Sequence, residues 1–521
     1  MRQLANLLET LIFNYSTKKK IEIIEQHLHK ITKDDRGYTI AFLLEKLKIK
    51  NIKRSEILKI VRKKIDSELF ALSYDYVGDL AETISLIWPD DNVKKESSVK
   101  RTLSELQSTN NLEKTIISLL NRFNKVERWA LIKLILGGLR VGVSDSIVKK
   151  AIAKYGKKDI SKIEYIWNGL SFPYTELFNW LDEKSSYPII DQSKVFHSFM
   201  LANTLDKKLL QNTINNNDFF LEHKWDGIRA QIVVKNNITK IYSRSGEDIS
   251  NSFPEISIKN TKLLVLDGEL LVGKKLEPFS FLELQKRINK KNPTKSLQLK
   301  LPAFIILYDL LYFEGNDIRN KKLIERRRLL DKWFTSQNNN CLDISKFIEF
   351  TTNADLYKIY KKCEEKKNIE GLMIKRKDSA YTAGRKKGNW YKWKKNPCFI
   401  DVILMYAQRG HGKRSSYYSD FTFGVWDNNR AVPIAKAYSG YTDKELSKID
   451  SFVRKNTVAK YGPVREVKKS LVFELAFDSA NSSKRHKSGL ALRFPRVHRI
   501  RWDKPVDEVL NLKSIKEELL N

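Results

Sequence analysis

The sequence has few cysteines and no long apolar run. Its three cysteines, Cys341, Cys363 and Cys398, lie far apart, and none is part of a C-x-x-C pair. We therefore expect no disulfide framework and no structural zinc site, and a reducing compartment fits this composition. No apolar stretch is long enough to cross a bilayer, and the start of the chain lacks a signal-peptide cleavage pattern. These absences predict a cytoplasmic protein with no membrane partner.

Acidic residues are scarce relative to basic ones. The 521 residues include 96 Lys and Arg against 62 Asp and Glu, which gives a formal net charge of +34 and a pI of about 9.7. An AT-rich genome that favours lysine codons could account for part of this excess. A surplus of this size would nevertheless repel itself without a polyanion, so nucleic acid is the expected partner. The length allows about three domains.

Helical periodicity dominates the first 187 residues. Apolar residues recur at helical spacing and strand-like alternation is rare, which predicts an all-helical domain of about eight to ten helices. The segment GGLRVG at 137–142 follows a long helical pattern. Its glycines would let backbone N–H groups approach phosphates, with Arg140 adding charge. The alternative is a glycine C-cap beside a solvated arginine.

A second region centres on the sequence LEHKWDGIRAQ at 221–231. An apolar approach runs into Lys224 and breaks at Asp226 and Gly227, so Lys224 should stand at a strand end beside a turn. Residues 228–234 and 238–243 predict a hairpin that places Arg244 near the same pocket. One lysine in so lysine-rich a chain carries little weight alone.

Further motifs follow Lys224 in a fixed order. Each places a charged or aromatic group at the end of, or alternating along, a buried strand, so several strands should converge on one pocket. The motifs are Asp267-Gly268-Glu269, Tyr308-Asp309, Glu370-Gly371 with Lys375, and Trp390-Tyr391-Lys392-Trp393-Lys394. The pocket would hold a lysine, two carboxylates and further cations.

Helices and a second set of strands surround these motifs. Residues 281–288 and 322–333 read as helices outside the sheet, with Lys286 and Arg287 on a solvated face. After Pro397, five short strands fit a small barrel of the oligonucleotide-binding kind. They are predicted at 399–406, 421–426, 432–438, 471–477 and 497–502. The loop 409–414 is either a phosphate contact or a mobile basic loop, and the basic run 484–487 is expected to be solvated.

This ordered set resembles the covalent nucleotidyltransferases, and most closely the ATP-dependent DNA ligases of bacterial and archaeal type. In that family K-x-D-G-x-R contains the lysine that becomes adenylated. The resemblance extends to RFPR at 493–496 and to the helical segment 127–144. It implies a multidomain protein: an all-α DNA-binding domain at 1–190, an α+β nucleotidyltransferase (ATP-grasp-like) adenylation domain at 191–396, and a β-barrel OB-fold domain at 397–521.

The resemblance also implies an activity. Such an enzyme seals nicks between 5′-phosphate and 3′-OH ends of duplex DNA through a lysine-AMP and an adenylated DNA intermediate, in replication, repair or recombination. Its cofactors would be ATP and Mg²⁺, with Mn²⁺ as a substitute. Its partner would be nicked double-stranded DNA, and we expect a monomer, nucleoid-associated if the source is prokaryotic.

Individual residues take roles from the same resemblance. The predicted catalytic residues are Lys224, Lys392, Lys394 and Asp503. The predicted ATP contacts are Glu222, Lys224, Arg229, Glu269, Tyr308, Lys375, Lys392, Lys394, Arg493, Arg496 and Lys504. The predicted DNA contacts are Arg140, Arg244, Arg409 and Arg414. Glu269 and Glu370 are the predicted metal ligands, because Mg²⁺ takes one or two carboxylates together with phosphate oxygens.

Several roles stay open at the level of sequence. Tyr308 could stack on adenine or pack in the core, Glu269 could contact ribose or metal, and Asp267 could be structural. Trp390 and Trp393 are expected to pack. The alternatives for the whole chain are an RNA ligase, an mRNA capping enzyme, or a basic scaffold with a decayed site. An NAD-dependent ligase is disfavoured because that family carries a four-cysteine zinc module.

Overall fold

The structure is a computed structural model that describes residues 1–14, 16–47, 52–77, 79–89, 97–139, 141–205, 214–274, 277–288, 290–366, 368–409, 417–462 and 464–520. The chain divides into two compact units. One unit is Gly156–Lys395, and the other combines Met1–Tyr155 with Asn396–Asn521. No helix among the described residues is both long and apolar enough to cross a membrane.

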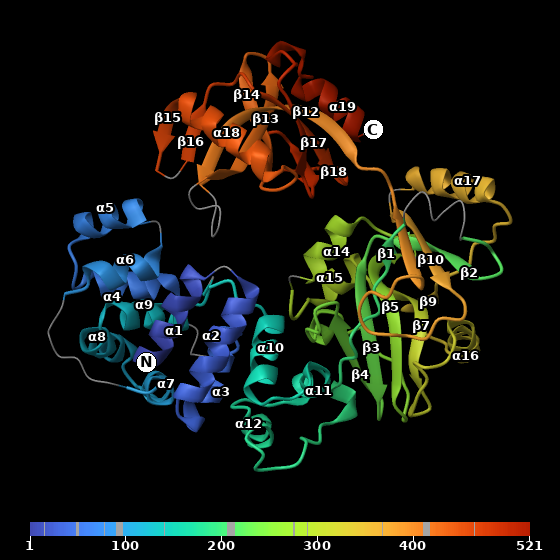
Figure 1. The fold of residues 1–521 in the computed structure, drawn as a ribbon, viewed down its shortest axis with the longest axis horizontal. Helices are drawn as coiled ribbons and strands as arrows, with labels where there is room; N and C mark the ends of the chain where they lie inside the picture. The colour runs from blue at the N-terminus through green and yellow to red at the C-terminus, as the bar shows by residue number, and fades with distance from the viewer. Residues whose placement is uncertain are drawn as a thin grey trace. The chain divides into compact units, whose positions relative to one another are not determined.

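The segment Met1–Tyr155 is helical, as its periodicity predicts (Figure 1). Helix α9 begins with a capping box, in which Asn124 accepts from the Glu127 N–H and Glu127 accepts from the Asn124 N–H. The helices are α1 (Arg2–Phe13), α2 (Thr17–Lys30), α3 (Lys33–Leu43), α4 (Arg54–Arg62), α5 (Ser67–Val77), α6 (Leu80–Ile87), α7 (Val99–Ser108), α8 (Leu112–Arg122), α9 (Lys125–Leu136) and α10 (Asp145–Tyr155). The helices α11 (Ile160–Ile166) and α12 (Thr175–Leu181) belong to the unit Gly156–Lys395. The division of the chain at 190 and 396 stays a prediction.

The unit Gly156–Lys395 contains two main sheets. The first has the strand order β4-β3-β5-β7-β8, with β6 on β5 and β9 parallel to β7. The second has the order β1-β11-β10-β2. The strands are β1 (Asn203–Thr204), β2 (Phe219–Trp225), β3 (Ile228–Lys235), β4 (Ile238–Ser243), β5 (Leu264–Lys274), β6 (Glu277–Pro278), β7 (Ala303–Phe313), β8 (Asn316–Asp317), β9 (Leu342–Ile344), β10 (Ile369–Arg376) and β11 (Trp390–Lys394).

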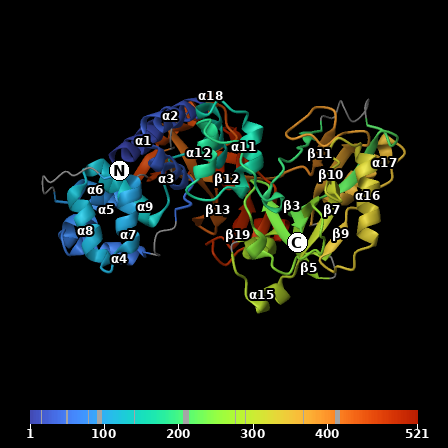
Figure 2. The ribbon, with the colours of Figure 1, turned by 90° about the horizontal axis from the view of Figure 1, so that it is seen from below.

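Helices cover both sheets of this unit. Helix α16 (Leu323–Thr335) packs on β7 and α17 (Asn353–Glu364) packs on β10 (Figure 2). Helices α14 (Phe281–Ile288) and α15 (Lys295–Lys300) follow β6 in the chain. A buried hydrophobic cluster brings together Val265 of the first sheet, Trp390 of the second sheet, and Met200. The expected packing role of Trp390 is therefore confirmed.

The predicted hairpin is confirmed, and one surface prediction is wrong. Strands β3 and β4 pair across Asn236 and Asn237, whose φ values of 52° and 63° suit a type I′ turn. Lys286 is exposed as expected, but the Arg287 side chain is fully buried. Its guanidinium donates to the carbonyls of Leu301 and Ser252 and pairs with Glu255. These partners compensate the cost of burying a charge.

The segment Asn396–Asn521 contains all five predicted strands and several more. The sheet has the order β14-β13-β12-β16-β15, with β17 between β12 and β20. Its elements are β12 (Cys398–Arg409), β13 (Tyr418–Asp427), β14 (Arg430–Ala437), α18 (Asp443–Lys455), β15 (Thr457–Tyr461), β16 (Val464–Val467), β17 (Val472–Phe477), β18 (Ser479–Ser482), β19 (Leu490–Arg493), β20 (Arg496–Arg501) and α19 (Leu512–Leu520). The run 484–487 is exposed, as predicted.

Candidate active site

Lys224 is the last residue but one of β2, just before the bend at Asp226 and Gly227, as its sequence context predicts. Strand β10 carries one extra residue opposite it, because Ile369 pairs with Trp225 while Gly371 pairs with Lys224. Glu370 is that extra residue, and its carboxylate accepts a hydrogen bond from Lys224 Nζ. The β-bulge thus places an acid against the candidate nucleophile.

Gly371 makes the bulge possible. Its φ is +140°, and a Cβ there would lie 2.0 Å from the Trp393 carbonyl oxygen. Only glycine allows the backbone of β10 to approach β11 this closely. The two residues of the Glu370-Gly371 motif therefore act together. Gly371 permits the bulge, and the bulge directs the Glu370 side chain toward Lys224.

Cations gather on the same face. Lys394 Nζ lies 3.6 Å from Glu370 Oε2, and Lys392 is two residues before Lys394 on β11. Burial lowers the pKa of Lys392, and the charges of Lys394, Arg385, Lys224 and Arg244 act in the same direction. The lysines predicted to face the α-phosphate therefore share one electropositive region with Lys224 and Arg244.

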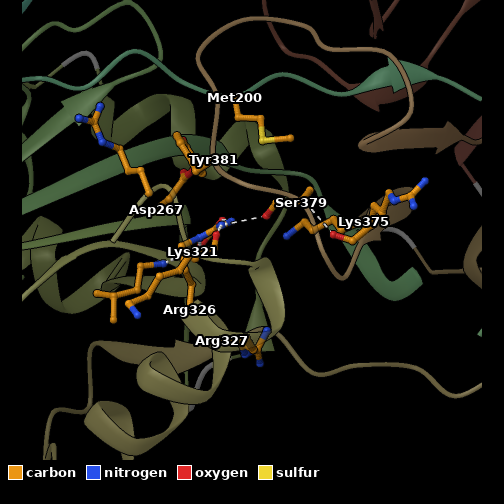
Figure 3. A network of polar contacts seen from close by, with 12 residues as sticks. Met200, Asp267, Lys321, Arg326, Arg327, Lys375, Ser379 and Tyr381 are labelled. Carbon is orange, nitrogen blue, oxygen red and sulfur yellow. Dashed lines mark hydrogen bonds and ion pairs between the residues drawn. The ribbon is translucent and has the colours of Figure 1, made fainter. Parts of the chain in front are cut away.

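Arg229 is held by a buried acid. Its guanidinium makes a bidentate pair with Asp267, at 3.1 and 2.7 Å, and donates to the Met200 carbonyl at 2.6 Å. Tyr381 donates to the same Asp267 oxygen as the Arg229 Nη2 group, at 2.7 Å (Figure 3). Asp267 is fully buried in the middle of β5, so it acts as the support that orients Arg229.

Tyr308 also sits at a bulge. Asp309 pairs with Asp267 and Leu307 pairs with Gly268, which leaves Tyr308 as the extra residue of β7. The Lys375 ammonium lies 4.1 Å from the centroid of its ring, and the Arg229 guanidinium lies 5.8 Å from it. An aromatic ring flanked by cations can take part in cation–π contacts and also offers a flat face to a base.

Glu222 forms the inner end of the pocket. Its Oε2 accepts from Lys375 Nζ at 3.0 Å and from Ser345 Oγ at 2.7 Å, and its Oε1 lies 4.0 Å from Arg327 Nη1. Figure 3 shows Lys375 and Arg327 in this network of polar contacts. All four residues are at most 4% exposed. Burial lowers the pKa of Lys375, against the charge of Glu222.

Glu269 and Glu370, the two predicted metal ligands, lie near enough to each other for their charges to interact. Burial raises the pKa of Glu269 to about 7, and the neighbouring charge of Glu370 acts in the same direction. No group of three or more His, Cys, Asp or Glu side chains that could hold a metal occurs in the described part of the chain. An ion here would therefore need oxygen ligands from a substrate as well, which is how Mg²⁺ is usually bound by phosphoryl-transfer enzymes.

The remaining predicted residues have the following positions. Arg244 follows β4 and is exposed, and Arg409 ends β12. Arg140 and Arg414 are outside the described residues. Four others, Arg493, Arg496, Asp503 and Lys504, belong to the second unit. Arg493 ends β19, and Arg496 forms an ion pair with Asp478 at 3.0 Å. Asp503 forms an ion pair with Arg501 at 3.1 Å, and Lys504 forms one with Asp401 at 2.8 Å.

Four residues of the network were not predicted from the sequence: Met200, Arg327, Ser345 and Tyr381. None of them belongs to the ordered motifs. Each reaches the pocket from a loop or from α16, and the carbonyl of Met200 rather than its side chain makes the contact. No pattern in the sequence indicates such contacts.

Comparisons with known proteins show to which family this chain is similar. Residues 1–153 match the model for the DNA ligase N terminus, 199–394 the ATP dependent DNA ligase domain, and 414–504 the ATP dependent DNA ligase C terminal region. A probable DNA ligase of Koribacter versatilis is 34% identical over 429 residues, which cover 77% of this chain and 73% of that protein. A DNA ligase of Methanococcus aeolicus is 31% identical over 455 residues, which cover 84% and 79%.

A solved structure named Pmar-Lig_Pre. shares the fold. It superposes with a TM-score of 0.58 at 18% identity and covers 96% of this chain and 99% of that one. Family models thus match the helical segment, the unit that contains Lys224 and the C-terminal strands. The chain belongs to the ATP-dependent DNA ligase family.

Proposed function

We propose that this protein seals nicks between 5′-phosphate and 3′-hydroxyl ends of duplex DNA, with Lys224 as the residue that carries AMP. The observation that supports it most directly is the position of Lys224. Its amine lies against Glu370, near Lys394, in the unit that also contains Arg229 and Tyr308. Family membership supports the choice of ATP and DNA as substrates.

The reaction has three displacements at phosphorus. In the first, Lys224 Nζ attacks the α-phosphate of ATP, an N–P bond forms, the bond to the bridging oxygen breaks, pyrophosphate leaves and Nζ loses a proton. In the second, an oxygen of the 5′-phosphate attacks the phosphorus of this AMP, a P–O–P linkage forms, the N–P bond breaks and the released amine takes up a proton. In the third, the 3′-hydroxyl oxygen loses its proton and attacks the 5′-phosphorus, the phosphodiester bond forms, the P–O–P linkage breaks and AMP leaves.

The residues of the pocket divide this work between them. Glu370 orients the Lys224 amine, while Lys392 and Lys394 stabilise negative charge at the α-phosphate. Arg229 holds the ribose, Tyr308 stacks on the base, and Glu222 and Lys375 complete the base site. A Mg²⁺ ion held by Glu269 and Glu370, or Mn²⁺ in its place, would neutralise phosphate charge.

The rest of the proposal concerns the parts outside this pocket. An all-α domain at 1–190 binds DNA through Arg140, and Arg244, Arg409 and Arg414 add contacts to the DNA backbone. An OB-fold barrel at 397–521 presents Arg493, Arg496, Asp503 and Lys504 to the pyrophosphate side of ATP, with Asp503 as a catalytic residue. The adenylation domain at 191–396 lies between these two in the sequence. The whole protein acts as a monomer in the cytoplasm, and it is associated with the nucleoid if the cell is prokaryotic.

The test is covalent labelling. Purified protein is incubated with Mg²⁺ and ATP labelled at the α-phosphate, denatured, and examined for label on the chain. We expect acid-labile label on the wild type, none on Lys224→Ala, and wild-type label on Lys259→Ala, a control at an exposed lysine of the same unit. Nicked DNA and nicked RNA added in a second stage show which polymer receives the AMP.

Three outcomes would contradict the proposal. Full labelling of Lys224→Ala would exclude Lys224 as the nucleophile. No label on the wild type, after a pyrophosphate wash that removes AMP already bound to the chain, would mean that the motifs no longer support nucleotide transfer. Transfer of AMP to nicked RNA rather than to nicked DNA would overturn the choice of substrate.

A further inference from the structure

Glu222 has two supports that belong to none of the ligase motifs in this sequence. Ser345 follows β9, and its hydroxyl donates to Glu222 Oε2 at 2.7 Å. Arg327 lies on α16, donates to the Ser345 carbonyl, and holds its Nη1 4.0 Å from Glu222 Oε1. Both residues are buried, at 1% and 4% exposure.

The two oxygens of Glu222 have different surroundings. Oε2 already accepts from Ser345 and Lys375. Oε1 is buried and has no hydrogen-bond partner among the described residues. Leaving a buried acceptor unpaired costs free energy, and a donor brought by a ligand would recover that cost. Arg327 Nη1, 4.0 Å away, is too far to donate a hydrogen bond to Oε1, so this carboxylate oxygen can accept from a donor that a ligand brings.

This arrangement bears on which nucleobase is accepted. A carboxylate only accepts hydrogen bonds, so it favours a base with an exocyclic amino group and disfavours one with a carbonyl at that position. The Lys375 ammonium, fixed by the same carboxylate, lies 4.1 Å from the Tyr308 ring. Movement of Glu222 would therefore disturb the donor contact and the aromatic face together.

We propose that Ser345 and Arg327 are positioning residues for nucleobase selection: they fix Glu222 so that its Oε1 receives the amino group of adenine. The inference rests on the proposed function, since it assigns selectivity to the same pocket. Neither residue touches the nucleotide. Their effect on the reaction passes through the orientation of Glu222 and of the Lys375 ammonium that Glu222 holds.

The experiment compares two nucleotides on the full chain. The rate of label transfer to Lys224 is measured as a function of concentration for ATP and for purine riboside triphosphate, which lacks the 6-amino group. We expect Ser345→Ala to reduce the preference for ATP by about tenfold, mainly through a higher KM for ATP, because one of the two donors that fix Oε2 is lost. Ser345→Thr, which keeps the hydroxyl, should retain the preference.

Matched variants distinguish a loss of the preference for ATP from a general loss of activity. Ser252→Ala removes another buried serine hydroxyl of the same unit, at 5% exposure, and should leave the preference unchanged. Arg327→Met should lower the preference in the same direction as Ser345→Ala. An equal loss of rate with both nucleotides in Ser345→Ala would overturn the inference while leaving the proposed function intact. In this experiment, failure of the proposed function would appear differently, as a wild type that takes no label from ATP.

Discussion

The Glu370 carboxylate lies in the pocket because β10 contains a bulge at this residue. Along β10, alternation would place residue 370 on the same face as Leu372 and Ile374, which pack in the core with Leu356 of α17. The bulge at Glu370 breaks this alternation and brings its carboxylate to Lys224 instead. Deleting the extra residue would therefore remove the acid from the site without changing any other motif.

His197 is a second residue whose environment has a measurable consequence. Its ring is buried between Tyr312, at a centroid distance of 4.7 Å, and Tyr165, at 6.0 Å. Burial lowers the pKa of His197 to about 3. The folded unit thus keeps this imidazole neutral under conditions in which an unfolded chain, with a histidine pKa near 6.5, would protonate it.

We predict an acid-dependent loss of stability from His197. Because its pKa is lowered on folding, its contribution is fully present above about pH 6.5 and is lost as the pH falls from there toward 3, by at most about 1.4 kcal/mol per pH unit. The free energy of unfolding of His197→Phe should therefore fall less steeply between pH 6.5 and 5 than that of the wild type. Urea denaturation at several pH values measures this slope. His486→Phe, at an exposed position, should keep the wild-type slope, and an unchanged slope in His197→Phe would refute the prediction.

Helix α14 shows what periodicity can and cannot reveal at the scale of an element. Its bounds at 281–288 agree with the predicted range, because its apolar residues follow helical spacing. Lys286 and Arg287 are consecutive basic residues on this helix, yet one is exposed and the other is fully buried. The partners of Arg287 are Glu255 and backbone carbonyls of Ser252 and Leu301, which no local pattern connects to the helix.

These neighbours provide a matched pair of substitutions. Arg287→Ala should lower the free energy of unfolding by about 3–5 kcal/mol, since it leaves Glu255 and two carbonyls without their buried partner. Lys286→Ala, on the exposed face, should change it by less than about 0.5 kcal/mol. Hydrogen exchange of the β5 amides in the full chain reports the difference. Equal protection in both variants would contradict the assignment of Arg287 to the core.

The sequence predicts the faces of the strands better than their connections. Glu222 and Lys224 are two residues apart on β2, and Lys392 and Lys394 are two residues apart on β11. Because side chains of a strand repeat with a period of two, this spacing alone places each pair on one face. The same rule fails at Glu370 because a bulge depends on how two strands pair. It also cannot find Ser345, whose contact with Glu222 spans 123 residues of sequence.

Charge is the property that belongs to the whole molecule. The net charge of +34 is spread over a chain in which family models match the helical, nucleotide-binding and C-terminal segments. A protein that neutralises DNA phosphates releases counterions, so its affinity falls steeply as salt increases. This behaviour is independent of the chemistry at Lys224.

We predict a specific change in this salt dependence for Arg140, a residue outside the described ranges. Arg140→Ala should weaken binding to nicked duplex DNA and reduce the slope of log affinity against log salt by about one, because one phosphate contact is lost. Adenylation by ATP should stay at the wild-type level. Fluorescence anisotropy between low and moderate salt measures the slope, and an unaltered slope would count against a phosphate contact at this residue.

The hydrogen bond between Lys224 and Glu370 has a consequence for chemical reactivity. The Lys224 amine is held by Glu370 and its side chain is only 22% exposed, so Lys224 should react slowly with acylating reagents while the pocket holds no nucleotide. The many exposed lysines of this chain would be modified first. In an amine-footprinting experiment on the free enzyme, the lysine with the most important chemistry should therefore be among the last to be labelled.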